Sequence, residues 1–349
     1  MLDGLRVLDL TMWRPGPYAT LLLAGMGADV LKVEPPGGEP MRAFGGHFGP
    51  LNAGKRGLVL DLKSPEGLAR CLELAADADA VVTGFRPGVA ERLGLAPERL
   101  RAKRAALVTC SLTGYGETGP LSGVPGHDVN YRATAGALPP GGLPPDAVDL
   151  PLADMAAAQT AAFAITAACL RASRTGEGTH LDIGLADTLA HWVSTAPPAL
   201  PSRDGVGPVA GYGVYTCADG LRVALGVVSE EHLWRAVCAA LELRHLADEP
   251  FAARISRVRE LDDAVRQALK GLPGDVALAR LEAAGAPASA VLDRAEMLAH
   301  PHFQARGVIT DAQDGEPRTG GLIPGQAKLS PAPALNQHDG QGWLPRTRA

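Results

Sequence analysis

The first hundred residues alternate short β-rich runs with helix-forming segments, and this alternation restricts the chain to few folds. Helix-forming segments at 17–26 and 65–75 follow two of these runs, and Ser64 with Pro65 supplies an N-cap and first turn for the second. Strands that alternate with helices form parallel sheets with helices on both faces. We therefore expect an α/β fold with a Rossmann-like large domain. The predicted strands cover residues 6–10, 29–34, 57–62, 80–83 and 106–112.

The turn after the first predicted strand argues against a dinucleotide cofactor. It runs from Arg14 to Ala19 and contains a single glycine, Gly16. A pyrophosphate-binding turn of a Rossmann fold needs the pattern Gly-x-Gly-x-x-Gly. We therefore expect no nicotinamide or flavin cofactor.

The length of the chain, 349 residues, predicts about two domains. Clustered Pro and Gly residues after position 196 indicate a boundary between them. We assign residues 1–196 to the large domain, 197–215 to a linker, 216–305 to a small α/β domain, and 306–349 to an extended segment that returns to the large domain. The predicted small-domain elements are strands at 221–227 and 288–292 and helices at 230–243, 258–270 and 274–284.

Composition and charge exclude several classes of protein. Hydrophobic residues make up 46% of the chain and charged residues 20%, as in folded globular proteins. The net charge of -5 argues against a dedicated nucleic-acid binder, because such proteins carry a basic excess. The amino-terminal segment lacks the basic flank and apolar run of a signal peptide, and we expect no membrane span of ~20 apolar residues.

The five cysteines indicate a reducing compartment. They are odd in number, widely separated, and include no Cys-x-x-Cys pair. This pattern fits reduced thiols better than a disulfide framework or a zinc site. We therefore expect a cytoplasmic protein without a metal site.

The tripeptide Gly126-His127-Asp128, followed by Asp154, supplies the chemical groups for moving a proton. Histidine is the side chain that titrates nearest neutral pH, so His127 can accept a proton there. Asp154 precedes a helix-forming run, where it could be an N-cap or a base, and the helix N-terminus would favour its carboxylate form. One base on each face of a carbon atom can invert its configuration. The pair therefore indicates an enzyme.

Six short motifs occur in order along the chain, at 15–20, 27–36, 54–56, 60–63, 86–88 and 114–120. In sequence and spacing they resemble the class III CoA-transferase family, which includes acyl-CoA transferases and α-methylacyl-CoA racemases. The resemblance covers nearly the whole chain and weakens after Leu200. It implies a homodimer of interlocked subunits, each with a Rossmann-like, CoA-binding large domain built from both chain ends.

The Gly-His-Asp motif is similar to that of the racemase branch. The resemblance implies that His127 and Asp154 are the two bases of a racemase that interconverts the C2 configurations of 2-methylacyl-CoA thioesters through an enolate. It also implies that Glu230 supports the histidine, with Glu231 as the alternative, because this loop varies by one residue in the family. The backbone N–H of Asp128 is a candidate donor to the thioester oxygen, since a forming enolate needs a fixed dipole close by.

Coenzyme A is a polyanion, so an acidic protein needs local cations to bind it. Arg86 lies at the carboxyl end of a predicted strand, where ligands of open α/β sheets bind. Lys55, Arg56 and Arg42 are the next candidates. CoA enters as part of the acyl-CoA substrate, so we expect no separate cofactor, no nucleic-acid partner and no membrane partner.

Two other functions would use the same residues differently. A class III acyl-CoA transferase would use Asp154 as a nucleophile and would leave His127 without an essential role. A non-catalytic CoA-binding protein would keep the cations but would have no use for two bases. The sequence does not define the acyl chain, because the six methionines are too scattered to outline an apolar surface.

Overall fold

The computed structural model describes residues 1–139, 150–196, 208–310, 318–321, 323 and 329–346. The chain divides into two compact units. Met1–Thr195 and Pro301–Ala349 form the large unit, and Ala196–His300 form the small unit. Most of the predicted linker, 197–215, lies outside the described residues, which resume at position 208.

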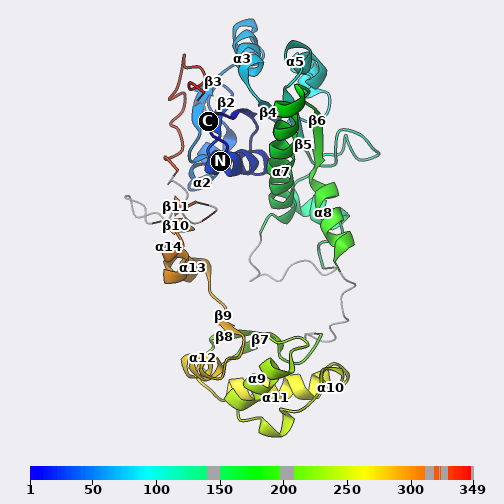
Figure 1. The fold of residues 1–349 in the computed structure, drawn as a ribbon, viewed down its shortest axis with the longest axis vertical. Coiled ribbons are helices and arrows are strands. Elements are labelled where there is room, and N and C mark those ends of the chain that lie inside the picture. Colours follow the sequence, from blue (N-terminus) through cyan, green and yellow to red (C-terminus); the bar gives the residue numbers. More distant parts are fainter. Residues whose placement is uncertain (140–149, 197–207, 311–317, 322, 324–328, 347–349) are drawn as a thin grey trace. The chain divides into compact units, whose positions relative to one another are not determined.

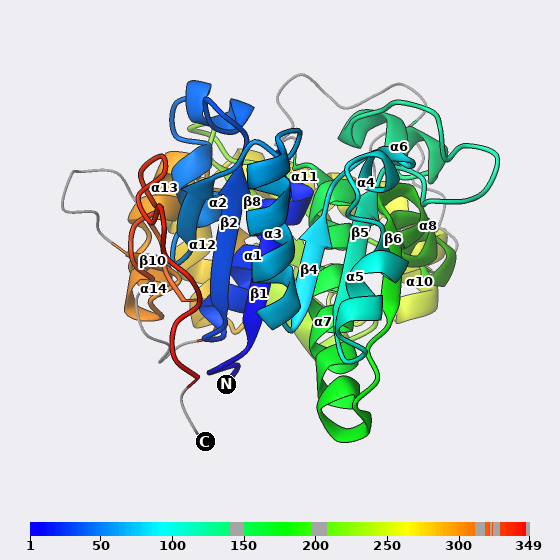
Figure 2. The same ribbon diagram turned by 90° about the horizontal axis from the view of Figure 1, so that it is seen from above.

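The large unit is built on a six-stranded parallel sheet (Figures 1 and 2), which confirms the expected Rossmann-like α/β fold. The strand order is β3-β2-β1-β4-β5-β6, so the order reverses between β1 and β4. Ligands of such sheets bind at this reversal, beyond the carboxyl ends of the strands. The strands are β1 Arg6–Leu10, β2 Asp29–Glu34, β3 Arg56–Val59, β4 Ala80–Thr83, β5 Val108–Thr113 and β6 His180–Gly184.

Helices cover both faces of this sheet (Figure 2). Because side chains alternate along a strand, one face packs against α3 Pro65–Asp77 and α5 Pro97–Lys103, and the other against α1 Pro15–Gly25 and α7 Leu152–Thr175. As the sequence predicts, Ser64 caps α3, because its Oγ accepts a hydrogen bond from the N–H of the third helical residue at 3.0 Å. The remaining helices of this unit are η1 Pro40–Ala43, α2 Phe48–Asn52, α4 Val89–Arg92, α6 Asp128–Thr134, α8 Leu185–Thr195 and α14 Pro301–Ala305.

Helices α1 and α7 pack side by side because their facing residues are small. Ala153, Ala157 and Ala161 of α7 share a core with Ala19 and Ala24 of α1, and all five are buried. We call the edge of the sheet where the parallel strands end the carboxyl edge. Helix α1 leads to the start of β2 and α7 to the start of β6, so each helix begins at the carboxyl edge. The N-termini of α1 and α7 therefore lie at the same edge.

Helix α7 bears on the expectation that the chain has no membrane span. It has 24 residues, and an 18-residue window within it has a mean hydropathy of 1.3, so by length and composition alone it could cross a membrane. Half of that window is buried inside the unit, where its alanines pack against α1. The core helix of a soluble protein passes the same test, so this apolar stretch is weak evidence for a membrane span.

Four charged side chains are buried together beneath the turn after β1. The Lys55 Nζ lies 3.1 Å from Asp9 Oδ2 and donates to Asn52 Oδ1 at 2.8 Å. The Lys32 Nζ lies 2.7 Å from Glu39 Oε2. Burial lowers the pKa of Lys55 to about 8, although the charge of Asp9 opposes the shift. These buried pairs hold the loops at the carboxyl edge.

The carboxyl-terminal segment lies beside β3 and α3 (Figure 1). The Asn336 Oδ1 accepts from the N–H of Val59 at 2.8 Å, and the Trp343 indole donates to the Leu74 carbonyl at 3.0 Å. Two short strands, β10 Ile309–Thr310 and β11 Arg318–Thr319, pair antiparallel before this segment. The large unit therefore contains both ends of the chain.

The small unit contains a three-stranded antiparallel sheet of order β7-β8-β9. Residues 212–215, which the sequence analysis placed in the linker, form most of β7, because pairing with β8 and burial of Tyr215 outweigh the local glycines. Trp234 and Leu261 are fully buried in the core between sheet and helices. The elements are β7 Tyr212–Thr216, β8 Arg222–Gly226, α9 Glu231–Ala240, η2 Arg244–Leu246, α10 Phe251–Ser256, α11 Val258–Lys270, α12 Gly274–Ala283, β9 Ala288–Ala290 and α13 Arg294–Ala299.

Replacing Lys55 should destabilise the large unit strongly. Lys55→Met leaves the fully buried carboxylate of Asp9 without its nearest cation, so we expect the free energy of unfolding to fall by ~3 to 5 kcal/mol. Urea denaturation followed by circular dichroism measures this. Lys63→Met, at an exposed position, should change the value by less than ~0.5 kcal/mol. Equal effects of the two substitutions would show that the buried pair does not stabilise the fold.

Candidate functional site

Two arginines at the carboxyl edge of the large unit have no ion-pair partner among the described residues. Arg14 follows β1 and Arg86 follows β4, the two strands between which the sheet order reverses. Arg86 is exposed and Arg14 is half-buried. Within the described part of the chain, neither guanidinium forms a hydrogen bond or ion pair. This edge therefore offers two free cations to an anionic ligand.

The carboxylate of Asp128 joins the two helices that carry the candidate bases. Asp128 is the first residue of α6, and its Oδ1 accepts hydrogen bonds from the backbone N–H groups of Ala153 at 2.8 Å and Asp154 at 3.2 Å, in the first turn of α7. Its Oδ2 lies 3.5 Å from Arg132 Nη1. Since His127 is the N-cap of α6, one side chain ties His127 and Asp154 together.

His127 is held by its backbone, while its side chain is exposed. Its N–H donates to Asn130 Oδ1 at 3.0 Å, and the carbonyl of the preceding Gly126 accepts from the Tyr131 hydroxyl at 2.5 Å. Tyr131 packs so closely on Gly114 that a Cβ there would lie 2.5 Å from its ring. The loop is thus fixed, and the imidazole stays accessible to a substrate.

Asp154 holds a proton more strongly than the sequence analysis predicts. We expected the helix N-terminus to favour the carboxylate form. Instead, burial and then the negative charge of Asp128 raise the pKa of Asp154 to about 7, while the charge of Arg14 opposes the shift. Near neutral pH, Asp154 therefore exists in both forms, which suits a group that both accepts and donates a proton.

Three of the four predicted CoA-binding cations form ion pairs with carboxylates of the large unit. Lys55 is fully buried in its ion pair. Arg56 binds both carboxylate oxygens of Asp29 at 2.9 Å, and Arg42 contacts both oxygens of Glu34 at 2.6 and 2.7 Å. These pairs fix β3 and the loop after β2, so CoA binding by these three cations stays a prediction. Of the four candidates, only Arg86 keeps a free guanidinium among the described residues.

An apolar pocket of about 170 Å³ lies at the carboxyl edge, and its lining includes Phe85, the residue before Arg86. It is bounded by the ends of β1, β2 and β3 and by the segment after β4. Lys63 at its wall is exposed and has no ion pair within the described ranges. The pocket could hold a flat apolar ring beside a cation. Its lining residues are Leu10, Met12, Val33, Glu34, Pro35, Pro36, Leu60, Asp61, Leu62, Lys63, Phe85 and Leu93.

Glu230 belongs to the small unit, whereas His127 and Asp154 belong to the large unit. Glu230 is the N-cap of α9, and its Oε2 accepts from the N–H of Val228 at 3.0 Å. Hydrogen bonds from its own N–H and from that of Val228 lower the pKa of Glu230. Glu231 lies 3.6 Å from an arginine of its own helix. The support of His127 by either glutamate stays a prediction.

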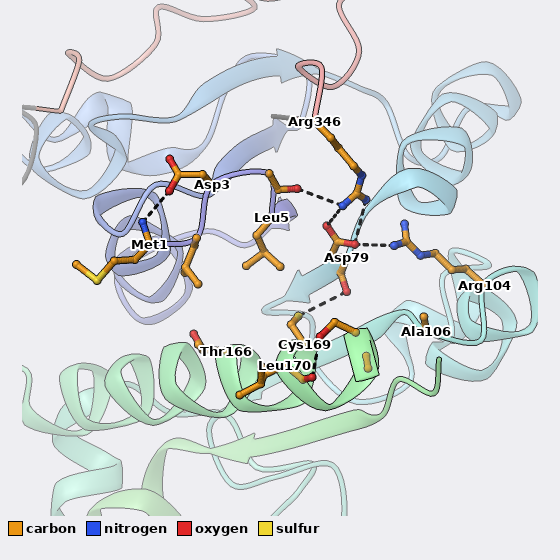
Figure 3. Close-up of a pocket in the computed structure, with 14 residues that line it drawn as sticks. Met1, Asp3, Leu5, Asp79, Arg104, Ala106, Thr166, Cys169, Leu170 and Arg346 are labelled. Carbon is orange, nitrogen blue, oxygen red and sulfur yellow. Dashed lines mark hydrogen bonds and ion pairs between the residues drawn. The ribbon is translucent and has the colours of Figure 1, made fainter. Parts of the chain in front are cut away.

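A second pocket, of about 440 Å³, lies at the opposite edge, where β1, β4 and β5 begin (Figure 3). Its polar groups already pair with one another. Asp79 contacts Arg104 at 2.5 Å and Arg346 at 3.0 Å. Among its described lining residues, this pocket therefore offers no unpaired charged side chain to a ligand, in contrast to the carboxyl edge.

The sequence analysis missed Arg14 and Lys63. Each follows a strand at the carboxyl edge, so the criterion that selected Arg86 would also have selected these two residues. In the ranges that the structure describes, no group of three or more His, Cys, Asp or Glu side chains is placed to hold a metal ion.

The raised pKa of Asp154 predicts a pH-dependent cost to stability. Between pH 3.8 and about 7 the unfolded chain ionises this carboxyl while the folded chain keeps it protonated. The free energy of unfolding is therefore highest below pH 3.8, where both states are protonated, and falls as the pH rises through about 7. Asp154→Asn should therefore raise the free energy of unfolding by ~1 to 3 kcal/mol at pH 8.5, and by clearly less at pH 5. Urea denaturation at both pH values tests this.

The exposed Glu73→Gln is the control for Asp154→Asn and should show no such pH-dependent gain. A gain of the same size at pH 5 and pH 8.5 would mean that Asp154 does not titrate in this window.

Comparisons with known proteins agree with this architecture. The sequence profile of CoA-transferase family III matches residues 2–339. The chain is 32% identical to the succinate–glutarate CoA-transferase of Agrobacterium fabrum, over 97% of this chain and 94% of that protein. It is 30% identical to the alpha-methylacyl-CoA racemase of Homo sapiens, over 92% of this chain and 86% of that protein.

Further relatives, 31–34% identical to this chain, are also named CoA-transferases. Among solved structures, a CAIB/BAIF family protein from Brucella suis matches with a TM-score of 0.81 and 30% identity, over 97% of each chain. The profile match spans nearly the whole chain, and so do the relatives and the structural match. The chain therefore belongs to CoA-transferase family III.

Proposed function

We propose that this protein is a racemase that interconverts the C2 configurations of 2-methylacyl-CoA thioesters. The proposal rests on the pair of His127 and Asp154, tied together by Asp128, with the pKa of Asp154 raised to about 7. In a reversible proton transfer each base must also act as an acid, so a pKa near the working pH is favoured. Imidazoles titrate in the same range.

The proposed reaction balances protons and electrons without a redox step. In one direction the Asp154 carboxylate removes the α-proton, and the electron pair of the C–H bond moves toward the thioester oxygen to give an enolate. Protonated His127 then donates its proton to the opposite face, and the enolate electrons form the new C–H bond. The reverse direction exchanges the two roles. The backbone N–H of Asp128 would stabilise the enolate oxygen.

The carboxyl edge supports binding of the CoA part of the substrate. We assign the adenine ring to the apolar pocket after β1 to β4, where Phe85 and Leu60 offer contact surface. Arg86 and Lys63 would contact phosphate groups of CoA, because both are exposed and unpaired in the described part of the chain. No further cofactor enters this reaction.

We also propose a homodimer in which Glu230 supports His127. The large unit exposes apolar side chains on two helices, with Phe163 of α7 76% exposed and Trp192 of α8 44% exposed. Exposed apolar groups of this size favour burial in a protein interface.

A cytoplasmic location is consistent with the five free cysteines, four of them buried.

The second candidate function is acyl-CoA transfer, which the names of several relatives favour. The Asp154 carboxylate would attack the thioester carbonyl and expel CoA thiolate, which would then attack the aspartyl carbonyl of the mixed anhydride, release the acid and form an aspartyl-CoA thioester. A carboxyl with a pKa raised to about 7 is only partly ionised at neutral pH. Both reactions need the ionised carboxylate, so this pKa does not separate them. We place the racemase first because it gives His127 a role, whereas transfer leaves His127 without an essential one.

Deuterium exchange at C2 separates the two functions. In D2O, with no second acyl acceptor, the wild-type protein should exchange the α-proton of both configurations of 2-methylbutanoyl-CoA, as followed by proton NMR. His127→Ala should lose exchange from one configuration and Asp154→Asn from the other, each by ~100- to 10,000-fold, because each base serves one face. His191→Ala, at an exposed position of α8, is the control and should behave as wild type.

Two outcomes would reject the racemase. One is a His127→Ala variant that interconverts the configurations at the wild-type rate. The other is a wild-type protein that transfers CoA between acids without exchange at C2, with a CoA adduct on the peptide containing Asp154 detected by mass spectrometry. The first result would remove His127 from the mechanism, and the second would make Asp154 a nucleophile.

A further inference from the structure

Arg132 is a buried cation on the helix that follows His127. It is the fifth residue of α6, and only 4% of its surface is exposed. Burying a guanidinium carries a large desolvation cost, and an apolar side chain of similar volume fills such a place without that cost. The charge of Arg132 therefore calls for an explanation beyond packing.

The contacts of Arg132 lie where the chain enters α7. Its Nη1 donates to the carbonyl of Leu150 at 3.3 Å and lies 3.5 Å from Asp128 Oδ2, one turn back along α6. Leu150 immediately precedes Pro151, the N-cap of α7. The other oxygen of the same carboxylate, Oδ1, accepts from two N–H groups in the first turn of α7. Arg132 and Asp128 thus bind the chain on both sides of the start of α7.

The start of α7 depends on an acceptor from another helix. Its N-cap is Pro151, whose side chain has no hydrogen-bond acceptor, so the first N–H groups of α7 need one from elsewhere. Asp128 supplies it from α6. A carboxylate held at one oxygen can rotate, whereas contacts at both oxygens select one orientation. The contact of Arg132 with Oδ2 provides the second hold.

We propose that Arg132 is a positioning residue that orients the carboxylate of Asp128, and through it the first turn of α7 with Asp154. Asp154 is the third residue of that helix, so a shift of the first turn moves its carboxyl directly. A misplacement of about 1 Å at a reacting group can lower a rate by ~100-fold. This inference rests on the proposed function only in taking Asp154 as the reacting group, which both candidate reactions share.

Amide hydrogen exchange, followed by NMR, tests the position of α7 without any reaction. Arg132→Met keeps the length of the side chain and removes its charge. In this variant the N–H groups of Ala153 and Asp154 should exchange ~10-fold or more faster than in the wild type, because their charged acceptor is no longer held. Arg132→Lys should restore part of the protection, since it returns the charge. Arg132→Gln keeps an N–H donor for Leu150 and should show the same loss, so it tests the inference if Arg132→Met does not fold.

The rate of the reaction is the second readout. For deuterium exchange at C2 of 2-methylbutanoyl-CoA, Arg132→Met should lower kcat by ~10- to 100-fold and change KM by less than ~2-fold, because other residues are assigned to the CoA part. Arg266→Met is the matched control. It removes an ion pair of the same spacing, 2.8 Å from Asp262 in the small unit, and should leave kcat and the exchange of the two amides as in the wild type.

The inference is overturned if Arg132→Met keeps the wild-type exchange of both amides, or if its kcat is unchanged. It is also overturned if amides throughout the large unit exchange faster to the same extent, because Arg132 would then stabilise the fold in general. A wild-type protein without exchange at C2 would instead reject the racemase. The same kcat comparison would then be made with acyl transfer, while the amide comparison would stand unchanged.

Discussion

The hydrogen bonds from the start of α7 to the carboxylate of Asp128 are the interaction on which the site depends. These hydrogen bonds join the N–H groups of Ala153 and Asp154 to Asp128 Oδ1, at 2.8 and 3.2 Å. They hold Asp154 beside the loop of His127. The same carboxylate adds a negative charge next to a partly buried Asp154, so it contributes to raising the pKa of that group to about 7. Asp128 therefore fixes the position of the central acid and adds to the larger effect of burial on its pKa.

The rest of the large unit supports this arrangement. Small residues on α1 and α7 let the two helices pack closely, and both then begin at the carboxyl edge, where Arg14 and Arg86 have free guanidinium groups in the described structure. Buried ion pairs of Lys55 and Lys32 fix the loops beneath. The edge combines free cations, an apolar pocket and two candidate bases, whereas the pocket at the opposite edge has its charges paired.

The fold could be predicted from the sequence because alternating strands and helices leave a strong local pattern, and Ser64 caps α3 as its sequence suggests. The roles of individual charges could not. Lys55 looks like a surface cation in the sequence, and only the folded chain shows it paired with Asp9, 46 positions away. The shift at Asp154 also depends on a long-range contact, with Asp128. The position of Arg14 after the first strand could be predicted, but only the folded chain shows that its guanidinium has no partner among the described residues.

The most direct test of this account is an NMR titration of the Asp154 side-chain carboxyl carbon in the wild-type protein and in Asp128→Asn. The account predicts a pKa of about 7 in the wild type. It predicts a lower pKa in Asp128→Asn, because the amide keeps a hydrogen-bond acceptor for α7 while removing the negative charge. A wild-type pKa near the ordinary aspartate value of 3.8, or an unchanged pKa in the variant, would contradict the account.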